Sequence, residues 1–159
     1  MSAHTCTVEW VRGAQPFTDQ KYSRAHRWQF DGGACVPASS SPHSVPVPWS
    51  DPAAVDPEEA FVAAVSSCHM LWFLSLAAQQ KLVVDRYADA AEGAMADIGD
   101  GRRAITLVVL RPEVVFSGTV LPDAAQVEAL HHAAHRRCYI ANSIRGEVRV
   151  QGSWRTAGA

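Results

Sequence analysis

The sequence has no marked excess of charge. Among 159 residues, 14 are Lys or Arg and 16 are Asp or Glu, which gives a net charge of -2 at pH 7. Nucleic acids and anionic membrane surfaces attract basic patches, so we expect no nucleic acid among the partners. The first residues, Met1 to Thr7, also lack the basic and then apolar pattern of a signal peptide. We therefore expect a cytoplasmic protein, in which thiols are kept reduced.

The sequence is also poor in cysteine and lacks any repeat. The four cysteines are Cys6, Cys35, Cys68 and Cys138. Their wide and irregular spacing excludes a CxxC motif, and it is not typical of a small disulfide-stabilised scaffold. If two cysteines act together, the fold must bring them together. The length predicts one domain over residues 1–159, large enough to bury a core.

One long apolar stretch, residues 57–80, dominates the chain. It opens with a helix-start signal, because Asp56 can cap the helix, Pro57 suits the first position and Glu59 completes a capping box. No Gly or Pro follows before about Gln80, and apolar residues occur all round. This pattern predicts a central buried helix.

The same stretch is long enough to cross a membrane, since no charged residue occurs from Ala60 to Ala78. However, its middle is polar, and polar groups inside a bilayer are costly. We therefore favour a helix in a protein core and expect no membrane contact. The polar residues in its middle are Ser66, Ser67, Cys68 and His69. Such buried groups need partners or a function.

Before this helix, residues 1–55 are expected to hold strands and a Pro-rich segment. Alternation predicts strands at Thr5–Val11 and His26–Phe30. Residues 35–56 contain five prolines and a run of serines, which favours irregular structure. A short edge strand is an alternative for residues 45–49.

After the helix, residues 83–98 are ambiguous between helix and strand, and a hairpin is predicted across residues 99–101. A strand is predicted at residues 104–110, and it continues at residues 114–116 after an interruption. A second helical region covers residues 122–145, with Val127, Leu130 and Ala134 as its apolar stripe, and residues 147–154 read as a closing strand. The predicted fold class is α+β, with antiparallel sheets around the long central helix.

Two cysteines are candidates for chemistry. Cys68 lies in the polar middle of the long helix, and its alternative interpretation is an inert buried cysteine. Cys138 follows Arg136 and Arg137 and precedes a helical turn, so both neighbours are expected to lower its pKa and leave it partly ionised. Its alternative is a structural cysteine at a helix junction.

A metal site is a further alternative. His131, His135 and Cys138 have a spacing that can place three zinc ligands on one helical face. The two arginines beside the cysteine oppose a cation. We therefore favour a solvated helix face rich in histidine over a zinc site.

Two motifs resemble one known family. The stretch from Asp56-Pro57-Glu58-Glu59 to Ser66-Ser67-Cys68 resembles the cysteine-helix signature of OsmC/Ohr proteins. The stretch Ala134-His135-Arg136-Arg137-Cys138, with Asn142 and Ser143 after it, is similar to that family's second-cysteine motif. The order of elements agrees over nearly the whole chain. Two neighbours of the cysteines, His69 and Tyr139, differ from the family's usual residues.

The resemblance implies a thiol peroxidase that reduces organic hydroperoxides and forms an intertwined homodimer. By position, Cys68 would be the peroxidatic and Cys138 the resolving cysteine. Glu58 would match the family's acidic residue and Arg24 its arginine, with Arg27 and Arg12 as weaker candidates. The implied enzyme needs no bound cofactor, and an external thiol or lipoyl-type reductant recycles its disulfide.

Helix geometry adds to this expectation. Ten residues separate Glu58 from Cys68, which is roughly 15 Å at about 1.5 Å per residue. Two such helices packed antiparallel across a two-fold axis would place each Glu58 near the other chain's Cys68. A non-catalytic protein that binds a hydrophobic ligand near Trp72 and Phe73 is the alternative function.

Overall fold

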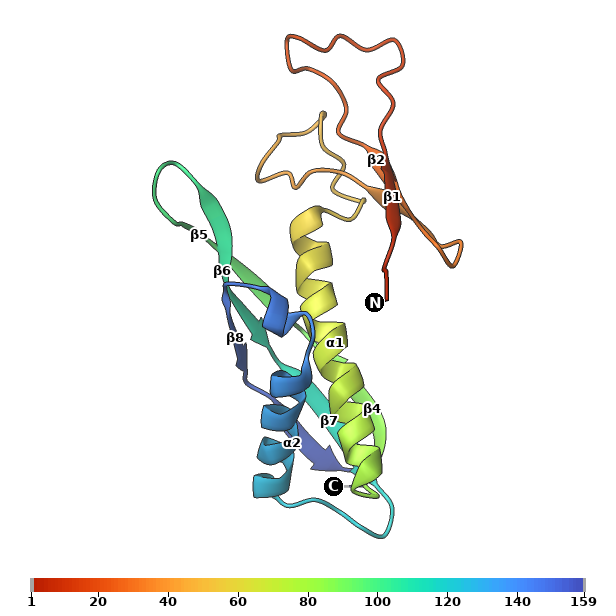
Figure 1. Ribbon diagram of the computed structural model, residues 1–159, viewed down its shortest axis with the longest axis vertical. Helices are drawn as coiled ribbons and strands as arrows, with labels where there is room; N and C mark the ends of the chain where they lie inside the picture. Colours follow the sequence, from red (N-terminus) through yellow and green to blue (C-terminus); the bar gives the residue numbers. More distant parts are fainter. Residues whose placement is uncertain (1, 159) are drawn as a thin grey trace. The chain divides into compact units, whose positions relative to one another are not determined.

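The computed structural model describes residues 2–158, and Figure 1 shows its ribbon. The chain forms strands and two long helices in an α+β arrangement. In chain order the elements are β1 (Cys6–Glu9), β2 (His26–Phe30), β3 (Cys35–Ala38), α1 (Pro57–Gln79), β4 (Val83–Asp89), β5 (Glu92–Asp97), β6 (Arg103–Leu110), β7 (Pro112–Ser117), α2 (Ala124–Arg137), a 3-10 turn (Ala141–Ser143), β8 (Glu147–Val150) and β9 (Ser153–Thr156). The fold class predicted from the sequence is confirmed.

The chain forms two compact units, one extending to Ala60 and the other beginning at Phe61. The N-terminal unit holds an antiparallel sheet of order β1-β2-β3. β2 has the predicted bounds, and β1 is shorter than predicted. No strand forms at residues 45–49, whereas β3 lies in the stretch predicted to be irregular. Its Pro37 is tolerated because β3 is the edge strand of this sheet.

The start of α1 follows its sequence signal closely. The backbone N–H of Glu59 donates to Oδ1 of Asp56 at 2.8 Å, and the backbone N–H of Asp56 donates to Oε2 of Glu59 at 3.2 Å. These two bonds form the predicted capping box and satisfy amides that the first helical turn leaves free. α1 then runs without a break to Gln79.

The C-terminal unit contains two sheets, of order β4-β7-β9 and β5-β6-β8. The ambiguous residues 83–98 form β4 and β5. β5 and β6 make the predicted hairpin, and its turn residues Gly99, Asp100 and Gly101 all have positive φ angles. Glycine adopts this backbone conformation without strain, which explains the turn signal.

The two C-terminal sheets are mixed instead of purely antiparallel, and the prediction of one closing strand at residues 147–154 was wrong. β8 pairs in parallel with β6, and β9 pairs in parallel with β7. The chain therefore passes from one sheet to the other at Gly152, between β8 and β9. It makes the same change at Arg111, between β6 and β7. A Cβ on Gly152 would lie 2.9 Å from Cγ of Pro112, so only glycine fits this crossing without rearrangement.

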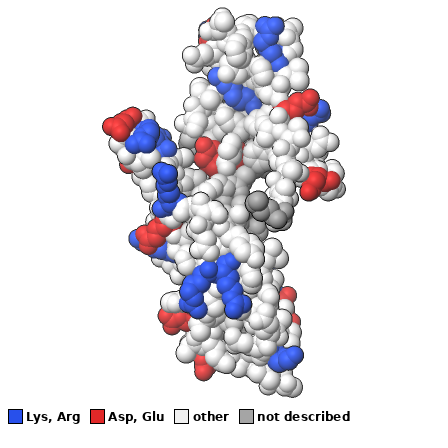
Figure 2. Space-filling view, in the orientation of Figure 1, with Lys and Arg blue, Asp and Glu red and all other residues white. Residues whose placement is uncertain are grey.

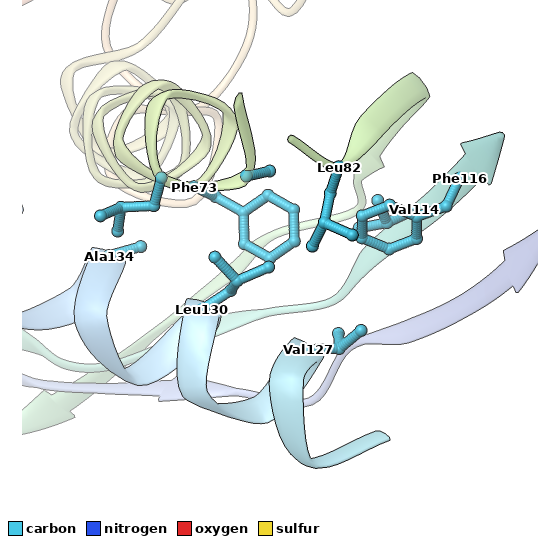
Figure 3. Packing of buried hydrophobic residues seen from close by; sticks show 9 residues of the cluster. Phe73, Leu82, Val114, Phe116, Val127, Leu130 and Ala134 are labelled. Atoms are coloured by element: carbon cyan, nitrogen blue, oxygen red, sulfur yellow. The ribbon is translucent and has the colours of Figure 1, made fainter. Parts of the chain in front are cut away.

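The larger hydrophobic cluster of this unit lies between α1, α2 and the β4-β7-β9 sheet. α2 begins with a second capping box, formed by Asp123 and Gln126. Figure 3 shows Phe73 of α1 directed toward Leu130 of α2, with Val114 and Phe116 of β7 on the sheet side. The apolar stripe predicted for α2 is buried as expected. α2 thus packs beside the C-terminal half of α1.

Only one face of α1 is covered within a single chain. Val65, His69 and Phe73 lie on the buried face, whereas Leu71 is 63% exposed. α1 is long and apolar enough to cross a membrane by length and composition, and 28% of its most apolar stretch is buried. Core helices of water-soluble proteins meet the same criteria. Leu71 is the one large apolar side chain of α1 that is exposed in the described structure.

Candidate active site

The polar middle of α1 is matched by polar partners in the C-terminal unit. Oγ of Ser66 donates to Oδ2 of Asp89 at 2.5 Å, and the other carboxylate oxygen accepts from the backbone N–H of Arg111 at 2.6 Å. The imidazole of His69 meets that of His131, with Nε2 and Nδ1 3.1 Å apart. These pairings account for groups whose burial the sequence left unexplained.

Cys68 and Cys138 are neighbours in the folded chain. Cys138 ends α2 at its C-cap and is 1% exposed, and Cys68 is half-buried on α1. Both thiols are free. The thiol of Cys68 is close enough to Cys138 to raise the pKa of the Cys138 thiol through a hydrogen bond and through charge repulsion. Seventy residues apart in the sequence, the two sulfurs form one site.

The expectation of a partly ionised Cys138 was wrong. Burial, and then the neighbouring Cys68 thiol, raises the pKa of Cys138 to about 11. The backbone N–H of Ala141, which donates to Sγ of Cys138 at 3.3 Å, opposes this shift and does not overcome it. Arg136 and Arg137 are exposed, and they do not offset the effect of burial on the pKa of the thiol. Cys138 is therefore a neutral thiol at pH 7.

An aromatic wall and a cation lie beside the thiol pair. Trp72 is one helical turn after Cys68, and its ring meets that of Tyr139 edge-on, with centroids 5.6 Å apart. The guanidinium of Arg137 lies 5.7 Å from the centre of the Trp72 ring, within the range of a cation–π contact. Tyr139 is 69% exposed. Apolar rings and one positive charge thus border the partly exposed Cys68.

The buried histidine pair is a feature that sequence reasoning missed. His69 is 1% and His131 7% exposed, and their rings stack with centroids 5.4 Å apart. Burial, and then the repulsion between neighbouring histidines, lowers the pKa of each ring to about 4. The nearby carboxylate of Asp89 raises the pKa of His69 and only partly offsets this. Both rings are neutral at pH 7.

A signal for this pair was present in the sequence. His131 falls one residue after Leu130 and four after Val127, on the edge of the apolar stripe of α2. The interpretation of the α2 histidines as one solvated face was therefore wrong for His131, although His132 is exposed. A histidine inside the apolar α1 and another on a buried stripe are candidates for pairing with each other.

The candidate arginines are engaged within the N-terminal unit. The guanidinium of Arg24 donates to the carbonyls of Gln20 and Tyr22 and lies 3.8 Å from the Tyr22 ring centre. Arg27 forms an ion pair with Glu9 across β1 and β2. Arg12 donates to a carbonyl in its own turn. Glu58 is half-buried in the first turn of α1, ten residues before Cys68 on one unbroken helix.

Two alternative sites receive no support. Among residues 2–158, no group of three or more His, Cys, Asp or Glu side chains is arranged to hold a metal ion. His131 faces His69, and Cys138 faces Cys68, so these two of the three residues whose spacing suggested zinc belong to separate pairs. Phe73 is fully buried in the core. It packs there instead of lining a ligand pocket beside Trp72.

Residues 50–152 match the model of the OsmC-like protein family. The chain belongs to this family. The matched residues include α1, both cysteines of the thiol pair and every strand of the two C-terminal sheets except β9. An OsmC-like protein of unknown function from Vibrio cholerae is 55% identical, with a TM-score of 0.94 over 96% of this chain and 100% of that one.

Other OsmC-like structures share the fold at low sequence identity. An organic hydroperoxide resistance protein from Elizabethkingia anophelis is 15% identical, with a TM-score of 0.66 over 99% of this chain and 98% of that one. One from Legionella pneumophila is 19% identical, with a TM-score of 0.63 over 97% and 98%. The comparison with curated proteins gave no match. The fold thus occurs in proteins named for hydroperoxide resistance.

Proposed function

We propose that this OsmC-like protein is a thiol peroxidase that reduces organic hydroperoxides with Cys68 and Cys138. The observation that carries the proposal is the contact between the two thiols, one partly exposed and one buried. Cys6 and Cys35, in contrast, are exposed on strands of the N-terminal unit. A reactive thiol that a peroxide can reach, next to a second thiol that it cannot reach, suits a two-step reduction.

The reaction balances with two thiols and one peroxide. The Cys68 thiolate attacks the O–O bond, so an S–O bond forms, Cys68 becomes a sulfenic acid and the peroxide leaves as an alcohol. The sulfur of Cys138 then attacks the sulfenic sulfur, which forms the disulfide and releases water. Two electrons pass from the thiols to the peroxide. An external thiol or lipoyl-type dithiol must return them, and no bound cofactor takes part.

The pKa of Cys138 supports this order of events. In the reduced protein, burial and repulsion by Cys68 keep Cys138 protonated, so no second thiolate lies beside Cys68. Conversion of Cys68 to a neutral sulfenic acid removes that repulsion. The Ala141 N–H, 3.3 Å from Sγ of Cys138, then stabilises the charge that develops on the attacking sulfur. Resolution is thereby coupled to the first oxidation.

The surroundings of Cys68 favour an organic peroxide over hydrogen peroxide. Trp72 and Tyr139 place aromatic surface beside the thiol pair. An alkyl or aryl group of a hydroperoxide would bury apolar area there, whereas hydrogen peroxide has none to bury. We therefore expect faster reaction with bulky aromatic hydroperoxides.

We further propose that the site is completed in a homodimer. α1 is unbroken between Glu58 and Cys68, and its opposite face, including Leu71, is uncovered within one chain. Two α1 helices packed antiparallel would cover this face and bring Glu58 of one copy toward Cys68 of the other. Arg24 would then be the arginine that Glu58 holds and that favours the thiolate. Sedimentation of dilute protein as a folded monomer would contradict the dimer.

Single-turnover oxidation followed by peptide mapping tests the peroxidase. One equivalent of cumene hydroperoxide should be consumed, and digestion without reductant should yield a peptide pair linked through Cys68 and Cys138. Cys6 and Cys35 should remain free and react with an alkylating reagent. A Cys6–Cys35 bridge, or no intrachain bridge, would remove the resolving role from Cys138. In the proposed dimer, substitution of Arg24 by Gln should slow the first step about tenfold or more, since it would remove the cation beside the thiolate.

A further inference from the structure

The backbone of Arg24 is held by contacts outside the sheet of the N-terminal unit. Its N–H donates to the carbonyl of Trp49 at 2.8 Å, and its carbonyl lies 2.8 Å from Nδ1 of His26. β2 begins only at His26, so neither bond belongs to the ladder of this sheet. Arg24 is half-buried, and half-buried backbone groups need such partners. The placement of Arg24 therefore depends on two specific contacts.

The tautomer of His26 follows from its two partners. The indole Nε1–H of Trp28 lies 3.0 Å from Nε2 of His26, and an indole nitrogen can only donate. Nε2 of His26 must therefore accept and carries no proton. A carbonyl oxygen can only accept, so Nδ1 of His26 carries the proton and donates to Arg24. Both partners require the same neutral tautomer.

The orientation of the His26 ring is set by the strand. His26 and Trp28 are two residues apart on β2, which places both side chains on the same face. Both are half-buried, and their ring centroids are 6.1 Å apart. The strand thus directs one nitrogen of the imidazole to Trp28 and the other back to the carbonyl of Arg24.

The side chain of Arg24 is folded over the turn that precedes it. Nη1 donates to two backbone carbonyls of that turn, and Cζ lies 3.8 Å from the centre of the Tyr22 ring. The Tyr22 ring packs in turn against Phe17 and Trp10, with centroids 4.8 and 5.4 Å apart. Both bonds start at Nη1, so they do not occupy the edge formed by Nε and Nη2. That edge suits bidentate pairing with a carboxylate.

The N-terminal unit offers no broad positive field that would make this placement unimportant. Its basic side chains are scattered over the face drawn in Figure 2 and form no continuous patch. A single guanidinium stabilises a thiolate only from close by, because solvent and salt screen a distant exposed charge. The exact position of Arg24 therefore decides its effect.

We propose that His26 is a positioning residue for the peroxidase reaction. Its Nδ1–H fixes the backbone of Arg24, so that the guanidinium is presented to the Cys68 thiolate in the homodimer. This inference rests on the proposed function and on the role of Arg24 within it. His26 acts through Arg24 and not on the sulfur itself. A histidine that only stabilises β2 would have the same effect whether or not residue 24 is an arginine.

Alkylation of Cys68 tests this role without any peroxide turnover. The full chain, reduced and at pH 7, is treated with iodoacetamide, and mass spectrometry follows the peptide that contains Cys68. The rate reports how readily Cys68 supplies the thiolate, which is the form that reacts. Arg24→Gln is the reference variant and should slow this alkylation about tenfold.

Three substitutions of His26 separate its two nitrogens. His26→Leu removes both and should slow alkylation of Cys68 about three- to tenfold, because Arg24 is no longer held in place. His26→Asn carries its amide nitrogen at the position of Nδ1 and should stay within about twofold of the parent chain. His26→Gln carries its nitrogen at the position of Nε2 and should behave like the leucine variant. His4→Leu is the matched control at an exposed histidine of the same unit.

A double variant shows whether His26 acts through Arg24. His26→Leu combined with Arg24→Gln should be alkylated as fast as Arg24→Gln alone, because the group that His26 positions is already absent. A further slowing in the double variant would overturn the positioning role. Where the leucine variant does not fold, the asparagine and glutamine variants decide, and equal rates for these two would also overturn it.

The failure of the proposed function has a different signature. If Arg24→Gln leaves the alkylation of Cys68 unchanged, Arg24 is not the arginine of the site, and the role of His26 is overturned with it. If Arg24→Gln slows alkylation and every His26 variant matches the parent, only the role of His26 is overturned. A parent chain that consumes no cumene hydroperoxide contradicts the peroxidase, and the alkylation rates still decide whether His26 positions Arg24.

Discussion

The thiol pair and the imidazole pair make two different uses of the same contact between helices. Cys68 and His69 are consecutive on α1, and their partners Cys138 and His131 lie two turns apart on α2 and its C-cap. Burial raises the pKa of the Cys138 thiol and lowers that of both imidazoles. In both cases burial favours the neutral form. The two pairs differ in access to solvent, because Cys68 is partly exposed and His69 is buried in the core. We infer that this access decides which pair can react with a substrate.

The largest effect should come from the accessible member of the thiol pair. Cys68→Ser should abolish consumption of cumene hydroperoxide, because a hydroxyl does not attack the O–O bond under these conditions. Stopped-flow measurement of peroxide loss checks this. Cys35→Ser is the control, since Cys35 is also accessible but has no thiol partner in the described structure. Equal rates in the two variants would place the chemistry elsewhere.

Removal of the buried thiol should separate the two steps. Cys138→Ser should retain the first turnover, because Cys68 is unchanged, but should lose catalytic cycling with a dithiol reductant. Under excess peroxide, Cys68 should advance to the sulfinic acid. Mass spectrometry should find about 32 Da added at Cys68, the mass of two oxygen atoms. Sustained turnover of this variant would show that Cys138 is dispensable.

The imidazole pair should control stability in acid and leave the thiols unaffected. Each ring has a native pKa of about 4, below the value of about 6.5 in the unfolded chain. The unfolded state therefore binds more protons between these values. Stability is fully present above pH 6.5 and falls as the pH drops toward 4, by a few kcal/mol in total. Urea unfolding at a series of pH values measures this loss.

The matched variant for this prediction is His69→Leu combined with His131→Leu. It removes both members of the pair, so neither is left unpaired, and the pH dependence should flatten. The surrounding titratable groups, His132, His135 and Asp89, remain. His132→Gln serves as a control because His132 is exposed. A steep acid dependence that survives in the double variant would contradict the assignment.

The smallest effect should come from the cation beside the thiol pair. Arg137→Gln removes the guanidinium over Trp72 and should slow the first oxidation of Cys68 about two- to fivefold, because an exposed charge is screened by solvent. Arg136→Gln, one residue away, should leave the rate unchanged. The difference should shrink at high salt. Equal rates for both variants would mean that Arg137 acts on Trp72 alone.

Local signals in the sequence determined several elements correctly. The capping box of Asp56 and Glu59 fixed the start of α1, and the glycines at residues 99 and 101 fixed the hairpin turn. These features depend on hydrogen bonds and φ angles within a few residues, so the sequence carries them directly. The two cysteine motifs also identified the family, which the family model confirms.

Other features depended on contacts between distant residues. The split of the closing strand into β8 and β9 follows from parallel pairing with β6 and β7, which no local pattern encodes. The edge strand β3 formed because β2 was available as its partner. Pairing of this kind is decided by long-range register, whereas alternation only reports which residues can face a core.

The same division holds for the candidate site. The sequence determined which residue types stand beside each cysteine, and the arginines before Cys138 suggested an ionised thiol. The tertiary structure decided otherwise, because it buries Cys138 against Cys68 while the arginines remain exposed. It also turned His131 inward to meet His69. A pKa depends on the solvent and charges around a group, and only the packing of α1 against α2 sets those surroundings.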